Sequence, residues 1–152
     1  MQARLVRLGV AGWLWPAWED GFYPADMPPE WRLTYYNTQF SCVFLTRGQW
    51  KQLSPREWEI WAEDTHDEFL FLLETQNNGG NETPPAPLQG RAQLLSAQDS
   101  CLIWFDAESD LKTLAAQLSA LPDSPHFLLS KDGDLGQIER VRTLLDLMGL
   151  AC

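Results

Sequence analysis

The sequence predicts an α/β protein with a mostly parallel sheet of about five strands and flanking helices. Short apolar runs alternate along the chain with longer segments that carry apolar residues at helical spacing, as in a series of β–α units. The runs are apolar at nearly every position, which is typical of parallel strands covered on both faces. The length of 152 residues fits a single domain, residues 1–152.

Five runs are predicted to be strands. They span residues 5–11, 42–46, 69–73, 101–105 and 126–130. We expect the first and fifth of these strands to lie at the edges of an open sheet. Edge strands carry unpaired backbone groups that must be covered or paired.

Four helices are predicted from capping residues and periodicity. They are expected over residues 27–37, 54–64, 111–121 and 135–148. Ser54 and Glu57 predict a capping box at the start of the second helix, and Gly149 is a stop for the last. In the first helix, Trp31, Tyr35 and Leu33 are expected to face inward.

Two segments between the predicted elements are less regular. Residues 75–87 are rich in asparagine, glycine and proline and lack an apolar anchor, which predicts a flexible loop. Residues 88–97 have an ambiguous pattern, for which we prefer a helix.

Aromatic side chains crowd the segment after the first strand. This aromatic loop, residues 12–24, contains Trp13, Trp15, Trp18 and Tyr23, and its glycines and prolines exclude a plain helix. Two interpretations are open, and both can hold together. The loop is a hydrophobic plug over the end of the sheet, or it is the wall of a binding site.

Composition excludes several classes of function. The net charge of −10 argues against binding to nucleic acid or to an anionic membrane surface. The first residues run directly into a strand without a signal peptide, so a cytoplasmic protein is expected. Cys42, Cys101 and Cys152 are too widely spaced for a zinc site and are read as small buried thiols. Phosphate-binding, dinucleotide-binding and nucleophile motifs are missing, so no cofactor and no metal is expected.

The first seventy or so residues resemble the YecE-like proteins, the family called domain of unknown function 72. The shared features are a strand followed by Gly-Trp, a proline spacer and Trp, then Phe-Tyr-Pro, a helix ending in Tyr-Tyr, a tryptophan helix and a Phe-x-Phe strand. Here these features fall at residues 9–18, 22–24, 27–36, 58–63 and 69–71. The resemblance implies a barrel of the triosephosphate-isomerase type whose activity is unassigned.

The chain departs from this family in polar positions and in length. Phe44 and Thr46 stand where the family has glutamate and asparagine, and Glu74 stands where it has lysine. A complete eight-stranded barrel takes about 250 residues, far more than this chain has. The resemblance therefore implies a truncated TIM-barrel-like arrangement that has lost polar groups of the family.

Function in parallel sheets and barrels sits at the carboxyl ends of the strands. Those ends place Arg47, Glu74, Asp106 and Lys131 near the aromatic loop. Two carboxylates and two cations could hold a small anionic ligand, with Trp13, Trp15, Trp18 and Tyr23 as the wall. The alternative is that these are solvated loop residues and that Asp106 caps the following helix.

Two functions follow from these observations. The first is a non-catalytic binding or assembly module that self-associates or binds a protein partner through the sheet edges. The second is a hydrolase- or isomerase-type enzyme acting on a sugar phosphate or sugar acid. In that case Glu74 or Asp106 is the acid or base, and Arg47 and Lys131 hold the anion.

Overall fold

Six parallel strands form one sheet in the computed structural model, which describes residues 6–19, 21–75, 83–122 and 124–150. The sheet order is β4-β3-β2-β1-β6-β5, so the first strand is central. The strands are β1 Val6–Ala11, β2 Cys42–Leu45, β3 Leu70–Glu74, β4 Ala92–Leu95, β5 Leu102–Phe105 and β6 His126–Ser130. The predicted α/β class with a parallel sheet is confirmed.

The prediction that the first and fifth predicted strands are the edges is wrong. β6, the fifth predicted strand, returns to pair with β1 over the register Val6↔His126 to Val10↔Ser130, and both strands are interior. The edges are β4 and β5. This return is how the last strand of a closed barrel meets the first, and a pairing so distant in the chain leaves no local signal.

The prediction of a helix over residues 88–97 is also wrong. β4 pairs with β3 there, from Phe71↔Ala92 to Glu74↔Leu95. Ala92 and Leu94 pack on one side of the sheet and Leu95 on the other. Alanine, glutamine and leucine are good helix formers, but pairing with a neighbouring strand overrides propensity in a run this short.

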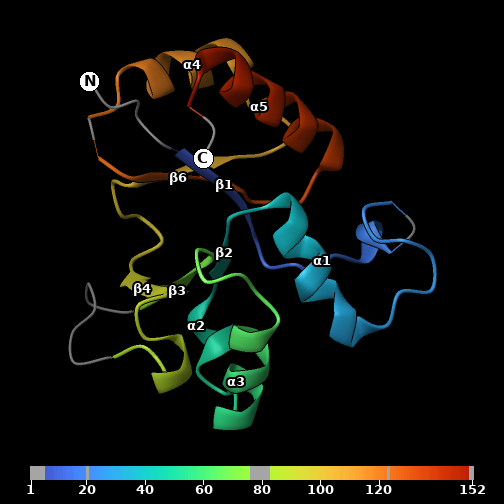
Figure 1. Cartoon of the computed structure of the whole chain (residues 1–152). Coiled ribbons are helices and arrows are strands. Elements are labelled where there is room, and N and C mark those ends of the chain that lie inside the picture. Colours follow the sequence, from blue (N-terminus) through green and yellow to red (C-terminus); the bar gives the residue numbers. More distant parts are fainter. Residues whose placement is uncertain (1–5, 20, 76–82, 123, 151–152) are drawn as a thin grey trace.

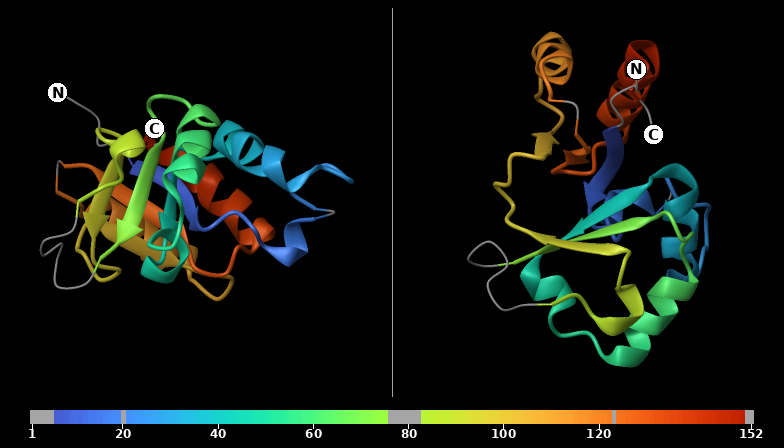
Figure 2. Two further views of the ribbon diagram at one scale, coloured as in Figure 1. Left: turned by 90° about the horizontal axis from the view of Figure 1, so that it is seen from below. Right: turned by 60° about the vertical axis from the view of Figure 1, so that its left-hand side comes forward.

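The sheet is curled into part of a barrel. Residues 96–101 join the edge strands β4 and β5, and the chain from Leu95 to Leu102 can span at most about 25 Å. A flat sheet would set the edges about 24 Å apart, and the connection must also run back along a strand. Only a curled sheet leaves room for that path, and the turned view in Figure 2 shows the curvature.

Strand residues alternate between two apolar cores. Val43, Leu45, Phe71 and Leu73 face the helices in the larger core. The concave face holds a second set, called the inner cluster. Its buried members are Cys42, Phe44, Leu72, Leu95, Leu102, Phe127 and Leu129.

An aromatic contact crosses the concave face. The rings of Phe44 and Trp104 meet edge to face with centroids 5.0 Å apart. Trp104 also donates a hydrogen bond from Nε1 to the carbonyl of Ala97, at 2.8 Å. The concave face of this partial barrel is therefore filled by side chains.

Helices cover the convex side of the sheet in two groups (Figure 1). The helices are α1 Arg32–Gln39, α2 Arg47–Trp50, α3 Pro55–Glu63, α4 Leu111–Ser119 and α5 Leu135–Met148. The described residues also form single turns of 3-10 helix at η1 Pro16–Trp18, η2 Pro29–Trp31 and η4 Ala86–Leu88. Figure 1 shows α4 and α5 side by side next to β6 and β1, and α1, α2 and α3 around the other half.

Local signals predicted the helix ends well. Ser54 and Glu57 form the expected capping box of α3, and Gly149 ends α5 at φ 69°. The expectation that Trp31 faces inward is wrong, because its side chain is 61% exposed. The prolines start a 3-10 turn, η2, which ends at Trp31. Trp31 therefore lies before α1 and not on its buried face, which carries Leu33 and Tyr36.

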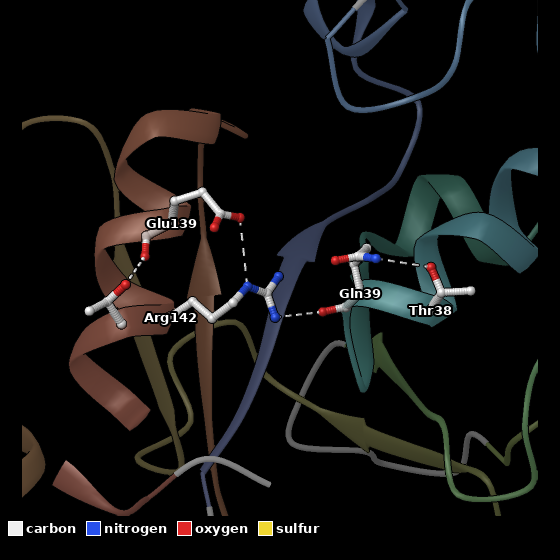
Figure 3. Close-up of polar contacts among 5 residues, drawn as sticks. Thr38, Gln39, Glu139 and Arg142 are labelled. Atoms are coloured by element: carbon white, nitrogen blue, oxygen red, sulfur yellow. Dashed lines mark hydrogen bonds and ion pairs between the residues drawn. The ribbon is translucent and has the colours of Figure 1, made fainter. Parts of the chain in front are cut away.

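The two helix groups are joined by Arg142 of α5 (Figure 3). Its Nη1 donates to the carbonyl of Gln39 at 2.8 Å, and its Nε lies 3.7 Å from Glu139 Oε1. Its guanidinium also covers the ring of Phe40, 5.1 Å from the centroid. The C-terminal helix thus contacts the end of α1 directly.

The remaining expectations on cysteines and loops are met in part. Cys42 is buried and Cys101 is half-buried, while Cys152 lies outside the described residues. Most of the predicted 75–87 loop, residues 76–82, also lies outside them. Over the part of the chain that is described, no helix has the length and apolar character that crossing a membrane requires.

Candidate functional site

Half of the aromatic loop is a plug. Trp18 is fully buried, stacks on Phe40 with centroids 6.2 Å apart, and donates from Nε1 to the carbonyl of Gly133 at 2.7 Å. Tyr23 is buried and donates its hydroxyl to the carbonyl of Trp13. Burial raises the pKa of Tyr23, an effect that the nearby Arg32 cation partly offsets. Trp18 and Tyr23 therefore hold the loop in place.

Tyr36 of α1 anchors the strands beneath this loop. Its hydroxyl accepts from the backbone N–H of Val10 at 2.9 Å and donates to the carbonyl of Cys42 at 2.7 Å. Burial raises the pKa of Tyr36 well above its ordinary value. The phenol thereby joins the two central strands just below the candidate site.

The other half of the loop forms one wall of a pocket of about 570 Å³. The facing wall comes from α2, α3 and the turn between them. The pocket is called the loop pocket, and its apolar lining includes Trp13, Leu14, Trp15, Leu45, Leu53 and Trp61. The rings of Trp13 and Trp61 meet edge to face with their centroids 4.7 Å apart, so the two walls of the pocket touch.

Three polar side chains line the loop pocket, namely Gln49, Gln52 and Glu57. Two of them belong to helix caps. Gln49 Oε1 accepts from the backbone N–H of Thr46 at 2.8 Å, and Glu57 Oε1 accepts from that of Ser54 at 3.0 Å. These bonds fix the side chains at the pocket rim and leave the Gln49 amide nitrogen and the second Glu57 oxygen for a ligand.

Gly133 positions the rim tryptophan. Trp15 is half-buried, donates from Nε1 to the carbonyl of Gly12 at 3.2 Å, and lies with its ring against the backbone of Gly133. A Cβ on Gly133 would lie 2.8 Å from Trp15 Cδ2. The loop after β6 thus sets the place of the pocket wall, although it follows in the chain by more than a hundred residues.

Glu74 and Arg47 lie together, but as parts of a helix start. Glu74 Oε1 accepts from the backbone N–H of Arg47 at 3.0 Å, and the carbonyl of Glu74 accepts from Trp50 Nε1 at 2.8 Å. A carboxylate at this position stabilises the first turn of α2. Neither side chain lines the loop pocket.

Asp106 and Lys131 lie in the other half of the sheet, where they follow β5 and β6. Asp106 Oδ1 accepts from the backbone N–H of Glu108 at 2.9 Å, forming a turn. The alternative that Asp106 caps the next helix is wrong, because Asp110 caps α4 by accepting from Thr113 N at 3.0 Å. Lys131 is exposed at the end of β6.

The four charged candidates do not meet in one place. β2, β1 and β6 lie between the strand that ends at Glu74 and the strand that precedes Asp106. Four strand spacings of about 4.8 Å separate these strands along the sheet, although curling shortens the direct path. Within residues 6–19, 21–75, 83–122 and 124–150, there is also no group of three metal-binding side chains.

Sequence reasoning found one wall of the loop pocket and missed the other. Trp13 and Trp15 line it, whereas Gln49, Gln52, Glu57 and Trp61 were not predicted as site residues. A local signal existed, since Thr46-x-x-Gln49 has the spacing of a capping box, as Ser54-x-x-Glu57 does. Two helix starts only eight residues apart imply a tight turn beside the strand end.

The comparison with family models agrees with the sequence resemblance. Residues 7–78 match the model of a family described as a protein of unknown function, DUF72. Among solved structures, a crystal structure of a DUF72 family protein from Thermotoga maritima is similar, with 16% identity and a TM-score of 0.43. The match covers 97% of this chain and 63% of that chain, so this chain spans less than two thirds of its length. The search of curated proteins gave no match.

Proposed function

We propose, from the premise that this chain belongs to the DUF72 family, that it is a non-catalytic module that binds a small ligand in the loop pocket. Because the function of the family is unknown, membership itself assigns no reaction.

The observation that carries the proposal is the loop pocket itself. Its volume of about 570 Å³ lies within the range of roughly 300–1,000 Å³ that is usual for small-molecule sites. It opens at the carboxyl end of the central strand β1, where parallel sheets bind their ligands. Its mixture of apolar walls and a few polar groups is also typical of such sites.

The concave face supports the non-catalytic part of the proposal. Phe44, in the position where the family resemblance leads us to expect glutamate, packs on Trp104 within the inner cluster. A charged group at that position would be costly unless it were paired. The remaining acidic candidates, Glu74 and Asp106, hold a helix start and a turn.

A ligand screen with matched tryptophan variants tests the proposal. A ligand at about one hundred times its Kd adds roughly 2.7 kcal/mol of stability, which raises the Tm of a chain this size by about 5–10 °C. The shift should disappear in Trp15→Ala, which removes a pocket wall. It should persist in Trp31→Ala, which removes an exposed tryptophan outside the pocket. Hits whose shifts survive Trp15→Ala would contradict the proposal.

Assembly is a second candidate, favoured by the sheet order. β4 and β5 are terminal strands, and each has one side without a neighbour in the described sheet. Such edges are templates for pairing with another chain. A light-scattering mass of two chains at micromolar concentration is the expected result, and a mass of one chain at every concentration would exclude self-association.

A further inference from the structure

We infer that the ligand of the loop pocket is an uncharged sugar ring. This inference rests on the proposed function and names the class of ligand. It follows from three properties of the pocket, namely its tryptophan lining, its two amide side chains and the charge of its lining.

The aromatic walls suit the flat side of a sugar. Trp13, Trp15 and Trp61 line the pocket on two facing elements, the aromatic loop and α3. The face of an aromatic ring carries partial negative charge. The axial C–H bonds of a pyranose present weakly positive hydrogens, so they pack on that face and bury apolar area there.

The polar rim suits hydroxyl groups. A hydroxyl is both a donor and an acceptor, and it needs partners of both kinds. Gln52 offers an amide nitrogen and a carbonyl oxygen, Gln49 offers its amide nitrogen, and Glu57 offers an acceptor oxygen only. Since Gln49 and Glu57 are fixed by their capping bonds, their remaining polar atoms are held in place before a ligand arrives.

The charge of the site argues against an anion. The described residues that line the pocket include no lysine, arginine or histidine. The chain carries a net charge of −10, which repels anions from its surface. A phosphate or carboxylate would lose water here without gaining a cationic partner. The sugar phosphates and sugar acids expected from the sequence therefore fit this pocket less well than their neutral parents.

A quaternary cation fits the aromatic walls and the Glu57 carboxylate, but it leaves the two rim amides without a partner. A quaternary ammonium group would pack on the tryptophans. It offers no hydrogen bond to Gln49 or Gln52, and amides that lose water without a partner weaken binding. The sugar ring uses both the walls and the rim.

The test is a titration of the full chain with chemically matched probes. Glucose, maltose, cellobiose and chitobiose form the neutral set, glucose 6-phosphate and glucuronate the anionic set, and choline is the cation. Tryptophan fluorescence and calorimetry report binding. We expect at least one neutral sugar to bind, and glucose 6-phosphate and glucuronate to bind at least tenfold more weakly than the neutral sugar that binds best.

Two variants assign the binding to the loop pocket. Gln52→Ala removes a rim amide that makes no helix cap, and it should weaken sugar binding at least fivefold. Trp15→Ala should abolish it, while Trp31→Ala should leave it unchanged. Far-UV circular dichroism of each variant separates loss of binding from loss of folding.

The outcomes separate the ligand class from the proposed function. Binding of anions or choline in preference to neutral sugars, still lost in Trp15→Ala, overturns the sugar inference and leaves the binding function standing. Sugar binding that survives both pocket variants overturns the inference, because the site lies elsewhere. If no probe binds, the sugar inference fails, and the broader ligand screen with Trp15→Ala then decides the proposed function.

Discussion

Replacing Gly133 with alanine tests how the loop after β6 holds the aromatic loop. Gly133 has φ +68°, and an added Cβ would lie 2.8 Å from Trp15 Cδ2 and 3.0 Å from Cε2. The left-handed backbone costs about 1–2 kcal/mol for a residue with a Cβ. Forcing an extra methyl group against a packed ring costs about 1–3 kcal/mol more. We therefore expect Gly133→Ala to lower the free energy of unfolding by about 2–5 kcal/mol.

Gly149 provides the matched control for this variant. It has φ +69°, and no atom of the described residues, apart from those of its chain neighbours, lies within 4 Å of the place its Cβ would take. Gly149→Ala should therefore lose only the backbone contribution, about 1–2 kcal/mol. The difference between the two variants measures the contact with Trp15.

The assay is urea unfolding followed by far-UV circular dichroism. A double-mutant cycle combines Gly133→Ala with Trp15→Ala. Removing the ring in Trp15→Ala should relieve the clash, so the pair should show a coupling of about 1–3 kcal/mol, as expected of residues in contact. If Gly133→Ala and Gly149→Ala lose the same stability within about 0.5 kcal/mol, Gly133 does not position Trp15, and the argument for a preformed pocket wall fails.

The remaining predictions concern buried groups. Tyr36→Phe leaves the Val10 N–H and the Cys42 carbonyl without their buried partner. Each lost bond should lower the free energy of unfolding by about 1–3 kcal/mol. Tyr35→Phe should be nearly neutral in the same urea assay. Because burial raises the pKa of Tyr36 and Tyr23, the unfolded chain loses these protons first as pH rises above about 10. The contribution of these two buried phenols to the free energy of unfolding is therefore fully present below about pH 10 and should fall above it. The free energy of unfolding should fall less steeply with pH in Tyr36→Phe. Phe44→Glu, which restores the residue type expected from the resemblance, should destabilise the chain by more than about 3 kcal/mol. Phe44→Leu should cost about 1 kcal/mol, and equal losses would refute a filled concave face. Burial, then the hydrogen bond and charge of Asp99, raise the pKa of Cys101 to about 12, so iodoacetamide at pH 8 should alkylate Cys101 slowly in the native chain and rapidly in urea, as read by peptide mass mapping.

Local chemistry explains which elements were predictable. The capping box of α3 and the left-handed glycine after α5 are set by neighbours in the sequence, and both were predicted. β4 was missed because its four residues become a strand only by pairing with β3. The sheet edges were misplaced for the same reason, since the return of β6 to β1 joins residues more than a hundred positions apart.

The candidate site was also predictable only where it depends on local sequence. Trp13 and Trp15 were found because the density of aromatic residues after a strand is visible in the sequence. The opposite wall was missed because it depends on how the turn between α2 and α3 packs against the loop. Arg47, Glu74, Asp106 and Lys131 do end their strands, but the sheet order separates them, and sheet order is a property of distant pairing.

The filled concave face and the open loop pocket have a common explanation. In a closed barrel the ring of strands covers the inner side chains, whereas the described sheet of six strands is open at β4 and β5. Phe44 and Trp104 cover part of the concave face by packing on each other across it. The loop pocket does not depend on closure of the sheet, because its lining runs only from Ala11 to Trp61. That span lies wholly inside residues 7–78, the part of the chain that matches the family. An open sheet can therefore have an apolar concave face and still carry this pocket.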